Sequence, residues 1–363
     1  MVSPEMGIPG GSKMFNYNYF DDFIKKLIIC NAAPIQVELQ PGVGCGGYNC
    51  KFCYGYNQEL AQGDELTKED YFRLLDDIKK TVKFITLAGI KSDPLNNPNA
   101  YDIIQRIKEN GFRLGIHTKG FLLNRNISNL LNANTAFGDF ITFSIDASDP
   151  VVYNSLHGLP AKANFFDQVR KNIQQLYERK KLTRSDLNVN VSYLLFKKNS
   201  SQGQIEKFIE IFGDISDVIR FSMPQIPNKA GGKPPYYLSS STAVSRVVDS
   251  LKKEYPRKRI VFLDFGDDAH ETYFKYCYAQ RFLAVIDHCG YVYPCPQITT
   301  MQFNQITYGN IKNKGFWEIW DSENRKKIIE TEVDKLACRI CDRKDETLNI
   351  KLNELFRNDK INS

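Results

Sequence analysis

The chain has 363 residues, of which 42% are hydrophobic and 25% are charged, and its formal net charge is +6. This composition is typical of a globular protein, and no apolar run approaches the roughly 18 residues that a membrane-spanning helix needs. Residues 1–16 lack a basic region, an apolar core and a small-residue cleavage site, so the sequence predicts a cytoplasmic protein that is neither exported nor bound to a membrane.

Between residues 35 and 222, short β-type runs alternate with amphipathic helical segments. This alternation predicts right-handed βαβ units and a parallel sheet, which is an α/β fold. The six expected strands are Ile35 to Leu39, Lys83 to Ala88, Phe112 to His117, Phe140 to Ile145, Leu187 to Leu194 and Val218 to Ser222.

Helical segments with one apolar face separate these strands. Thr67 followed by Asp70 is typical of a helix cap, and apolar side chains at helical spacing come after it. The same spacing recurs between Ile103 and Ile107, where Gly111 closes the helix, and again over residues 166–177. We expect these segments to be the helices that connect parallel strands.

The composition changes over residues 225–237, which are rich in Pro, Gly, Asn and Lys, and this change predicts a boundary. Beyond it the sequence predicts a helix over residues 242–253, a hairpin over 282–293 that turns near Gly290, and a closing helix after Cys341. We therefore expect an N-terminal extension (1–32), a large α/β domain (33–225), a linking segment (226–275) and a small cysteine-rich domain with a C-terminal helix (276–363).

The nine cysteines are distributed unevenly. Three lie at Cys45, Cys50 and Cys53, five lie between Cys277 and Cys341, and Cys30 stands apart. In a large chain without an export signal, cysteines serve metal or redox chemistry more often than disulfide formation. The two groups therefore predict two metal centres.

The first group, Cys45-Gly-Gly-Tyr-Asn-Cys50-Lys-Phe-Cys53, directly follows the first expected strand. Ligands and reactive groups of such folds lie at the carboxyl ends of parallel strands. Three thiolates can hold three irons of a [4Fe-4S] cube and leave the fourth iron open, whereas a cluster held entirely by protein needs four. A zinc knuckle is the alternative, because a Cys-x-x-Cys pair is common in zinc sites.

This arrangement resembles the radical S-adenosylmethionine (SAM) superfamily. In that family the open iron is chelated by the amino and carboxylate groups of SAM, and an electron from the cluster cleaves SAM to methionine and a 5′-deoxyadenosyl radical. The family usually has three residues between the first two cysteines, and this sequence has four. Phe52 matches the aromatic residue that the family places beside adenine. The resemblance implies an external one-electron reductant such as flavodoxin or ferredoxin.

Later strand ends extend the resemblance. Gly89, Ser92 and Asp93 stand where the family has a Gly-Gly-Glu-Pro-like segment that receives the methionine amino group, with Asp93 in place of the usual Glu. Ser144 and Asp146 are similar to the family's Ser-x-Asp strand end near SAM. Alternatively, Asp93 starts a turn, and Ser144 and Asp146 cap the next segment.

Two further strands carry candidate site residues. His117, at the end of the third strand, could line the SAM site. Arg220, on the sixth strand, would point toward the barrel mouth, where its guanidinium could anchor a carboxylate or phosphate of the substrate. An ion pair with a neighbouring acid at the surface is the alternative for Arg220.

The C-terminal cysteines resemble the twitch domain, a shortened relative of the SPASM domain that holds an auxiliary cluster. The resemblance assigns a second [4Fe-4S] cluster to Cys277, Cys295, Cys338 and Cys341. Four thiolates leave no open iron, which favours electron transfer over direct substrate binding. A structural four-cysteine zinc site is the alternative.

Cys289 is left over within this module and has three interpretations. It is a buried small residue, an alternative ligand to Cys277, or a thiol that gives a hydrogen atom to a substrate radical. The same hydrogen-donating role is a weaker hypothesis for Cys30.

The resemblance covers about residues 33–345 and implies a partial (βα)6 TIM-like barrel with a small C-terminal auxiliary-cluster domain. It also implies a reaction. The deoxyadenosyl radical takes a hydrogen atom, a base removes a proton, and the auxiliary cluster accepts the remaining electron. We expect the dehydrogenation of a small polar molecule such as a sugar or an aminocyclitol.

Two alternatives remain open. A peptide maturase would cross-link or epimerise a ribosomally made peptide, but about thirty residues precede the first strand, which are too few for a separate leader-recognition domain. Outside the enzymes, a zinc-stabilised binding module could bind nucleic acid. The lysines do not gather with aromatic residues into one tract, so we expect no nucleic-acid partner.

Overall fold

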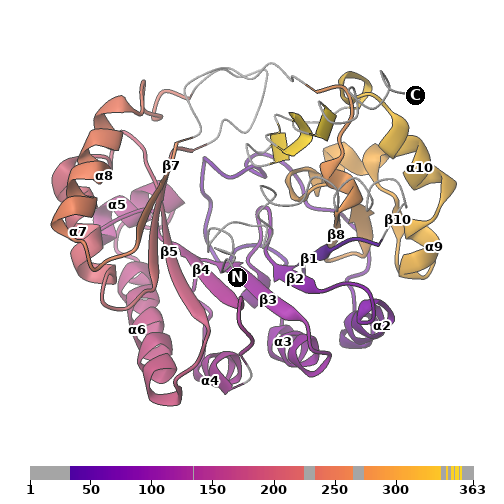
Figure 1. Cartoon of the computed structure of the whole chain (residues 1–363), viewed down its shortest axis with the longest axis horizontal. Coiled ribbons are helices and arrows are strands. Elements are labelled where there is room, and N and C mark those ends of the chain that lie inside the picture. The colour runs from indigo at the N-terminus through magenta and orange to yellow at the C-terminus, as the bar shows by residue number, and fades with distance from the viewer. Residues whose placement is uncertain are drawn as a thin grey trace, which may run out of the picture.

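The computed structural model describes residues 33–133, 135–224, 234–264 and 274–336, together with 341, 345–346, 348–350 and 352–353. These residues form one sheet with the strand order β10-β9-β8-β1-β2-β3-β4-β5-β6-β7 (Figure 1). The strands are β1 (Gln36–Gln40), β2 (Phe84–Leu87), β3 (Arg113–Thr118), β4 (Phe140–Ser144), β5 (Asn188–Leu194), β6 (Val218–Ser222), β7 (Ile260–Leu263), β8 (Leu283–Asp287), β9 (Tyr291–Tyr293) and β10 (Gly309–Asn310).

Strands β1 to β6 pair in chain order and are all parallel. This result confirms the α/β fold and the partial barrel, because β7 and β10 are the two edges of an open sheet. The sequence did not predict how the later strands join it. β7 extends the sheet beside β6, and β8 pairs in parallel with β1. Strands from the expected linking segment and C-terminal domain thus share the barrel sheet, and the proposed domain boundaries stay predictions.

Helices α2 to α7 connect the parallel strands (Figure 1). The capping box predicted at Thr67 is present, with the Thr67 side chain bound to the Asp70 backbone and the Asp70 carboxylate bound to the Thr67 backbone. The helices are α2 (Lys68–Ile78), α3 (Ala100–Glu109), α4 (Arg125–Ala133), α5 (Pro150–His157), α6 (Phe165–Thr183), α7 (Gln202–Phe212), α8 (Thr242–Glu254), α9 (Phe316–Trp320) and α10 (Glu323–Glu330).

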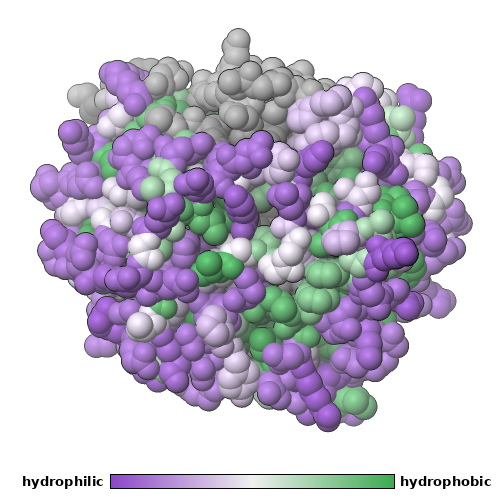
Figure 2. Space-filling view, turned by 180° about the vertical axis from the view of Figure 1, so that it is seen from behind, coloured by the Kyte–Doolittle hydropathy of each residue, from purple (hydrophilic) through white to green (hydrophobic). Residues whose placement is uncertain are grey.

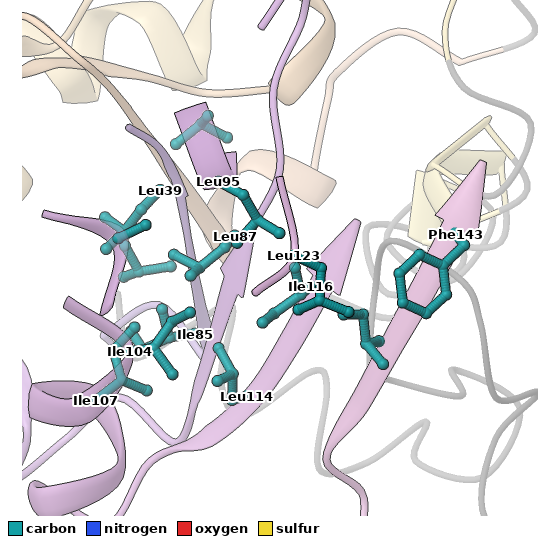
Figure 3. Packing of buried hydrophobic residues seen from close by; sticks show 14 of the residues in the cluster. Leu39, Ile85, Leu87, Leu95, Ile104, Ile107, Leu114, Ile116, Leu123 and Phe143 are labelled. Atoms are coloured by element: carbon teal, nitrogen blue, oxygen red, sulfur yellow. The ribbon is translucent and has the colours of Figure 1, made fainter. Parts of the chain in front are cut away.

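The main core fills the space between the sheet and its helices. Figure 3 shows Ile85 and Leu114 from the sheet beside Ile104 and Ile107 of α3, and all four are buried. Because side chains alternate across a strand, the residues between these apolar positions face the inner side of the curved sheet. Many of those residues are polar yet buried: Gln36, Glu38, Gln40, Thr86, Thr142, Asn190 and Ser192. The inner face is therefore suited to a polar ligand.

The outer surface is mostly hydrophilic in the view of Figure 2, with hydrophobic residues gathered in the lower middle. This pattern agrees with the globular protein that the composition predicts. Among the helices that the structure describes, none is both long and apolar enough to cross a membrane.

Candidate functional site

The first three cysteines lie on the loop between β1 and α2, at the carboxyl end of β1. Gly46 and Gly47 have positive φ angles of 63° and 101°, which a side chain would disfavour and which let the loop fold back within a few residues. The Cys53 N–H then donates to the Cys50 carbonyl at 3.1 Å. The three thiols are thereby held on one compact loop at the mouth of the sheet.

The sulfur atoms have hydrogen-bonding neighbours that suit metal-bound thiolates. Cys53 Sγ accepts the backbone N–H groups of Gly55 and Lys91, each at 3.4 Å. Cys50 Sγ lies 3.1 Å from His157 Nδ1, but this nitrogen accepts rather than donates while Nε2 carries the ring proton, so it is not one of these donors. Hydrogen bonds to sulfur stabilise the negative charge of an iron-sulfur cluster and help to set its potential. The donor set at this loop therefore fits a cluster held by thiolates.

Burial keeps the Cys45 and Cys50 thiols protonated while no metal is bound. It raises the pKa of Cys50 to about 11, and burial together with the Asp93 carboxylate raises the pKa of Cys45 further. Cluster binding must therefore release protons. No three His, Cys, Asp or Glu side chains of the described chain are arranged around a single metal-ion position.

Lys119, immediately after β3, is a functional candidate that the sequence analysis missed. Its side chain is 14% exposed, and its Nζ lies 3.2 Å from His157 Nδ1 and 3.5 Å from Asp146 Oδ2. Burial lowers the pKa of Lys119, but the Cys50 thiol and the Asp146 carboxylate raise it to a net value above its ordinary range. Lys119 is thus a nearly buried cation beside the cysteine loop.

His157, at the end of α5, connects Cys50 to the end of β4. Its Nε2 lies 2.9 Å from the Ile145 carbonyl, which accepts only if this nitrogen carries the proton. Burial and the Lys119 charge hold the pKa of His157 well below its usual value, so the ring is neutral. Nδ1 is then the acceptor that faces Lys119 and Cys50.

The predicted Asp146 lies at the same place and has a left-handed backbone with φ 60°. Its Oδ1 accepts the Leu194 N–H at 2.8 Å, and its Oδ2 faces Lys119. Burial raises the pKa of the Asp146 carboxyl, whereas Lys119 opposes that rise. Asp146 therefore ties the end of β4 to β5 and balances the Lys119 charge.

Several hydrogen bonds hold the carboxylate of the predicted Asp93. Its carboxylate accepts the Thr118 hydroxyl at 2.8 and 2.9 Å, the Lys119 N–H at 2.6 Å and the Leu95 N–H at 2.9 Å. Asp93 therefore joins the turn after β2 to the end of β3. That turn also contains the predicted Gly89 and the buried Ser92.

Phe52 lies between the histidine and a second aromatic residue. Its ring centroid is 5.8 Å from that of His157 and 4.8 Å from that of Phe196, which follows β5. Lys119 Nζ lies 5.6 Å from the same ring. The structure thus brings Phe52, Asp93 and Asp146 together around Lys119 and the cysteine loop.

The remaining barrel residues form two rows across the inner face. Ser144, Ser192 and Arg220 are in register on β4, β5 and β6, and Arg220 Nη2 donates to Ser192 Oγ at 3.0 Å. His117 is in register with Thr142 on β4, and its ring contacts Phe140 with a centroid distance of 5.4 Å. Arg220 is therefore hydrogen-bonded to β5 within this row.

Three of the C-terminal cysteines lie before or after the hairpin of β8 and β9. Cys277 precedes β8 and its Sγ accepts Asn349 Nδ2 at 3.5 Å, while Cys295 comes soon after β9. Cys341 is half-buried. Cys338 and Cys30 lie outside the described residues.

Cys289 is buried in the hairpin turn itself. Its Sγ lies 3.6 Å from the Ala61 carbonyl and 3.7 Å from that of Gly63, and burial raises its pKa to about 11. These are the contacts of a thiol packed against a neighbouring loop. Its role as a hydrogen-atom donor stays a prediction.

The two cysteine regions adjoin each other in space. The buried Gln40, at the end of β1, donates from Nε2 to the Pro296 carbonyl at 3.3 Å, and its Oε1 accepts the Thr299 hydroxyl at 2.6 Å. The Thr300 hydroxyl likewise donates to Gln58 Oε1 at 2.7 Å. The segment after Cys295 is therefore hydrogen-bonded to both sides of the Cys45–Cys53 loop.

Replacing Gly158 with Ala is expected to disturb the first cysteine loop. Gly158 ends α5 with φ 65°, and a Cβ there would lie 2.5 Å from the carbonyl oxygen of Asn49, the residue before Cys50. We expect Gly158→Ala to lower iron bound per chain after anaerobic reconstitution. Gly203→Ala is the matched control, because its Cβ would meet nothing within 4 Å. Equal iron content in both variants would contradict this expectation.

Replacing Lys119 with Met should weaken the first site without removing a ligand. Loss of a cation beside Cys50 disfavours the more negative, reduced state of a cluster, and substitutions around a metal site typically cost roughly 10- to 100-fold in activity. We expect a more negative midpoint potential and slower SAM cleavage. The exposed Lys162→Met is the control. A potential equal to that of the control would show that Lys119 does not act on the cluster.

Comparison with known proteins agrees with this geometry. Residues 39–202 match the radical SAM superfamily, and residues 277–342 match the iron-sulfur cluster-binding domain called SPASM. An AdoMet-dependent heme synthase of Methanosarcina barkeri is 21% identical over 88% of this chain and 91% of its own. A Pyrococcus furiosus protein that modifies the cofactor of a tungsten-containing aldehyde ferredoxin oxidoreductase is 23% identical over 76% of this chain and 77% of its own.

Solved structures share the fold. SuiB of Streptococcus suis, solved with SAM, has a TM-score of 0.60 at 16% identity, and the match covers 82% of this chain and 68% of that one. The family matches account for both cysteine regions, one in each matched segment. The chain therefore belongs to the radical SAM superfamily and carries a C-terminal SPASM domain, so that SAM and [4Fe-4S] clusters are its cofactors.

Proposed function

We propose that this radical SAM enzyme is an oxidoreductase that removes two hydrogens from a small polar molecule, such as a sugar or an aminocyclitol. The observation that carries the proposal is the bridge between its two cysteine regions, because Gln40 binds both Pro296 and Thr299. A substrate at the mouth of the sheet would lie close to both centres. Such an arrangement suits a reaction that starts at one centre and ends at the other.

The residues that would hold the two clusters follow from this arrangement. Cys45, Cys50 and Cys53 would hold the SAM-binding cluster, and the auxiliary cluster would be held by Cys277, Cys295, Cys338 and Cys341. When bound, SAM and the first cluster would supply a radical that takes one hydrogen atom from the substrate, and the auxiliary cluster would supply an acceptor for the electron left after a proton departs.

The chain's own residues would bind and orient SAM. Phe52 and Phe196 offer aromatic faces for adenine, and their rings are tilted by 36° to each other. Ser144 and Asp146, together with His117, Gly89 and Ser92, are the proposed contacts for the rest of SAM. Asp93 would act by fixing the turn after β2, since its carboxylate already accepts from three donors of the chain.

The inner face of the sheet supports a small polar substrate. Thr142 and Asn190 are in register and at most 1% exposed, and neither side chain has a hydrogen-bond partner in the described structure. Buried polar groups are costly unless they are paired, so these groups favour a ligand or waters that both donate and accept hydrogen bonds. Arg220, in the adjacent row, would anchor a negatively charged group of the substrate.

A peptide maturase remains the second candidate. Its support is the fold similarity to SuiB, which was also solved bound to its precursor peptide SuiA. In either case an external one-electron reductant is needed, and we propose flavodoxin or ferredoxin.

The test is deuterium transfer under turnover. Reduced protein with SAM is incubated with deuterated polyols and aminocyclitols, and separately with deuterated peptides. The proposal predicts deuterium in 5′-deoxyadenosine from a small polyol, together with a product that has lost two hydrogens. Deuterium from peptides alone would favour the maturase. Deuterium transfer without loss of two hydrogens would contradict net oxidation.

A further inference from the structure

Arg325, in the first turn of α10, is a buried cation that the proposed reaction does not use. Its side chain is fully buried, and its guanidinium carbon lies 3.5 Å from the centre of the Trp320 ring. Nη1 donates to the Trp320 carbonyl at 2.8 Å, whereas Nε and Nη2 have no hydrogen bond of normal geometry to the described residues, although the Tyr308 hydroxyl lies near enough to interact with the guanidinium. No carboxylate of the described residues lies within ion-pair distance of it.

A second arginine lies nearby, which makes the charge imbalance larger. Arg281, before β8, is half-buried, and its Nε is enclosed without a hydrogen-bond partner among the described residues. Burial and the positive charge of Arg281 lower the pKa of Arg325 to about 10. A buried charge without a close counter-charge is strongly destabilising. Asp321 and Glu330 act on these charges only from beyond ion-pair distance, so among the described residues the two arginines are incompletely balanced, and a nearby anion would stabilise them further.

Contacts through Tyr308 and Gln280 connect Arg325 to the backbone at Cys277. The guanidinium lies 5.7 Å from the ring centre of the buried Tyr308. The Tyr308 hydroxyl donates to Gln280 Oε1 at 2.9 Å, and Gln280 Nε2 donates to the Cys277 carbonyl at 2.9 Å. Both Cys277 and Cys295 are close enough to Tyr308 to act on its charge. An anion that balances the two arginines would thus lie at the cysteines that are proposed to hold the auxiliary cluster.

A cluster held by four thiolates is such an anion. The thiolates outweigh the positive charge of the iron-sulfide core, and reduction adds one more negative charge. We propose that Arg325, assisted by Arg281, sets the reduction potential of the auxiliary cluster by stabilising its reduced state. This role rests on the proposed function, since it makes the cluster a better acceptor for the electron that leaves the substrate.

The test is the midpoint potential of the auxiliary cluster, measured by redox titration in full-length protein whose Cys45, Cys50 and Cys53 are replaced with Ala. We expect Arg325→Met to shift the midpoint to a more negative value and Arg325→Lys to restore most of it. Arg281→Met should shift it in the same direction by less. Arg179→Met is the control, because Arg179 is exposed on α6, across the molecule from α10 (Figure 1).

Each outcome has a distinct meaning. A purely structural role in stacking on Trp320 would lower stability and leave the potential unchanged in Arg325→Met, and that result would overturn the inference. Equal shifts in the Met and Lys variants would also overturn it, because charge would not be the cause. If Arg325→Met does not fold, an unchanged potential in Arg281→Met is decisive against it. If the protein that lacks the first three cysteines but keeps both arginines binds no iron, that result would instead contradict the proposed function.

Discussion

Replacing Cys45, Cys50 and Cys53 together with Ala is expected to abolish formation of 5′-deoxyadenosine from SAM under reducing conditions. These three thiols are the proposed ligands of the SAM-binding cluster, and without them SAM has no reductant. Iron bound per chain should fall from about eight atoms to about four, since each cube holds four irons. The measurement pairs an iron assay with quantification of deoxyadenosine by chromatography.

Cys289→Ala is the matched control for this experiment. Cys289 is also buried, but its sulfur faces the carbonyls of Ala61 and Gly63. We expect this variant to keep its iron and to cleave SAM at the normal rate. Deoxyadenosine formation by the triple variant would disprove the assignment of these ligands. Loss of iron from Cys289→Ala would move Cys289 into the auxiliary set, as an alternative to Cys277.

Replacing Cys277 and Cys295 with Ala is expected to have the opposite pattern of effects. The SAM-binding site should remain, so the variant should still form deoxyadenosine, with about four irons per chain. Oxidation of the substrate should be lost, because the electron left on the substrate would have no acceptor. The measurement is the ratio of oxidised product to deoxyadenosine, which should fall from near equality to the limit of detection.

Two results would contradict this account of the auxiliary cluster. Unchanged iron content would show that these cysteines are not ligands. Full oxidation in a variant that has lost the cluster would show that the electron leaves by another route. If the variant forms neither deoxyadenosine nor oxidised substrate, Gln40→Ala tests whether the bridge between the two regions is responsible. This variant keeps every cysteine but removes the hydrogen bonds to Pro296 and Thr299.

Much of the fold could be predicted from sequence because the strands have simple patterns. Each expected strand overlaps an observed one, and Val218 to Ser222 coincides with β6. The pairing of β8 with β1 could not be predicted. Residues 283–287 form a short apolar run that suits a strand, but nothing local indicates a partner almost 250 residues earlier in the chain, since pairing is decided by packing of the whole sheet.

Residues at the mouth of the sheet could be named from the sequence where a cysteine spacing or a strand-end motif marks them, as for Phe52, Asp93 and Asp146. The cysteine spacing and the glycines between them identify the first loop without a structure. Lys119 and His157 are far apart in the sequence, and folding brings Nζ within 3.2 Å of Nδ1. The available signal was a lysine directly after the third strand, where a side chain reaches the mouth of the sheet. The structure also shows that backbone N–H groups and a hydroxyl already donate to the Asp93 carboxylate, which the position of Asp93 in the sequence does not reveal.

The most direct test of the two-cluster enzyme is the iron, sulfide and zinc content of the anaerobically reconstituted chain, with deoxyadenosine assayed in the same sample after reduction with SAM. Our account predicts about eight irons and a matching amount of sulfide per chain, little zinc, and deoxyadenosine formation. About four irons with SAM cleavage would remove the auxiliary cluster. Zinc in place of iron, without SAM cleavage, would contradict the account as a whole.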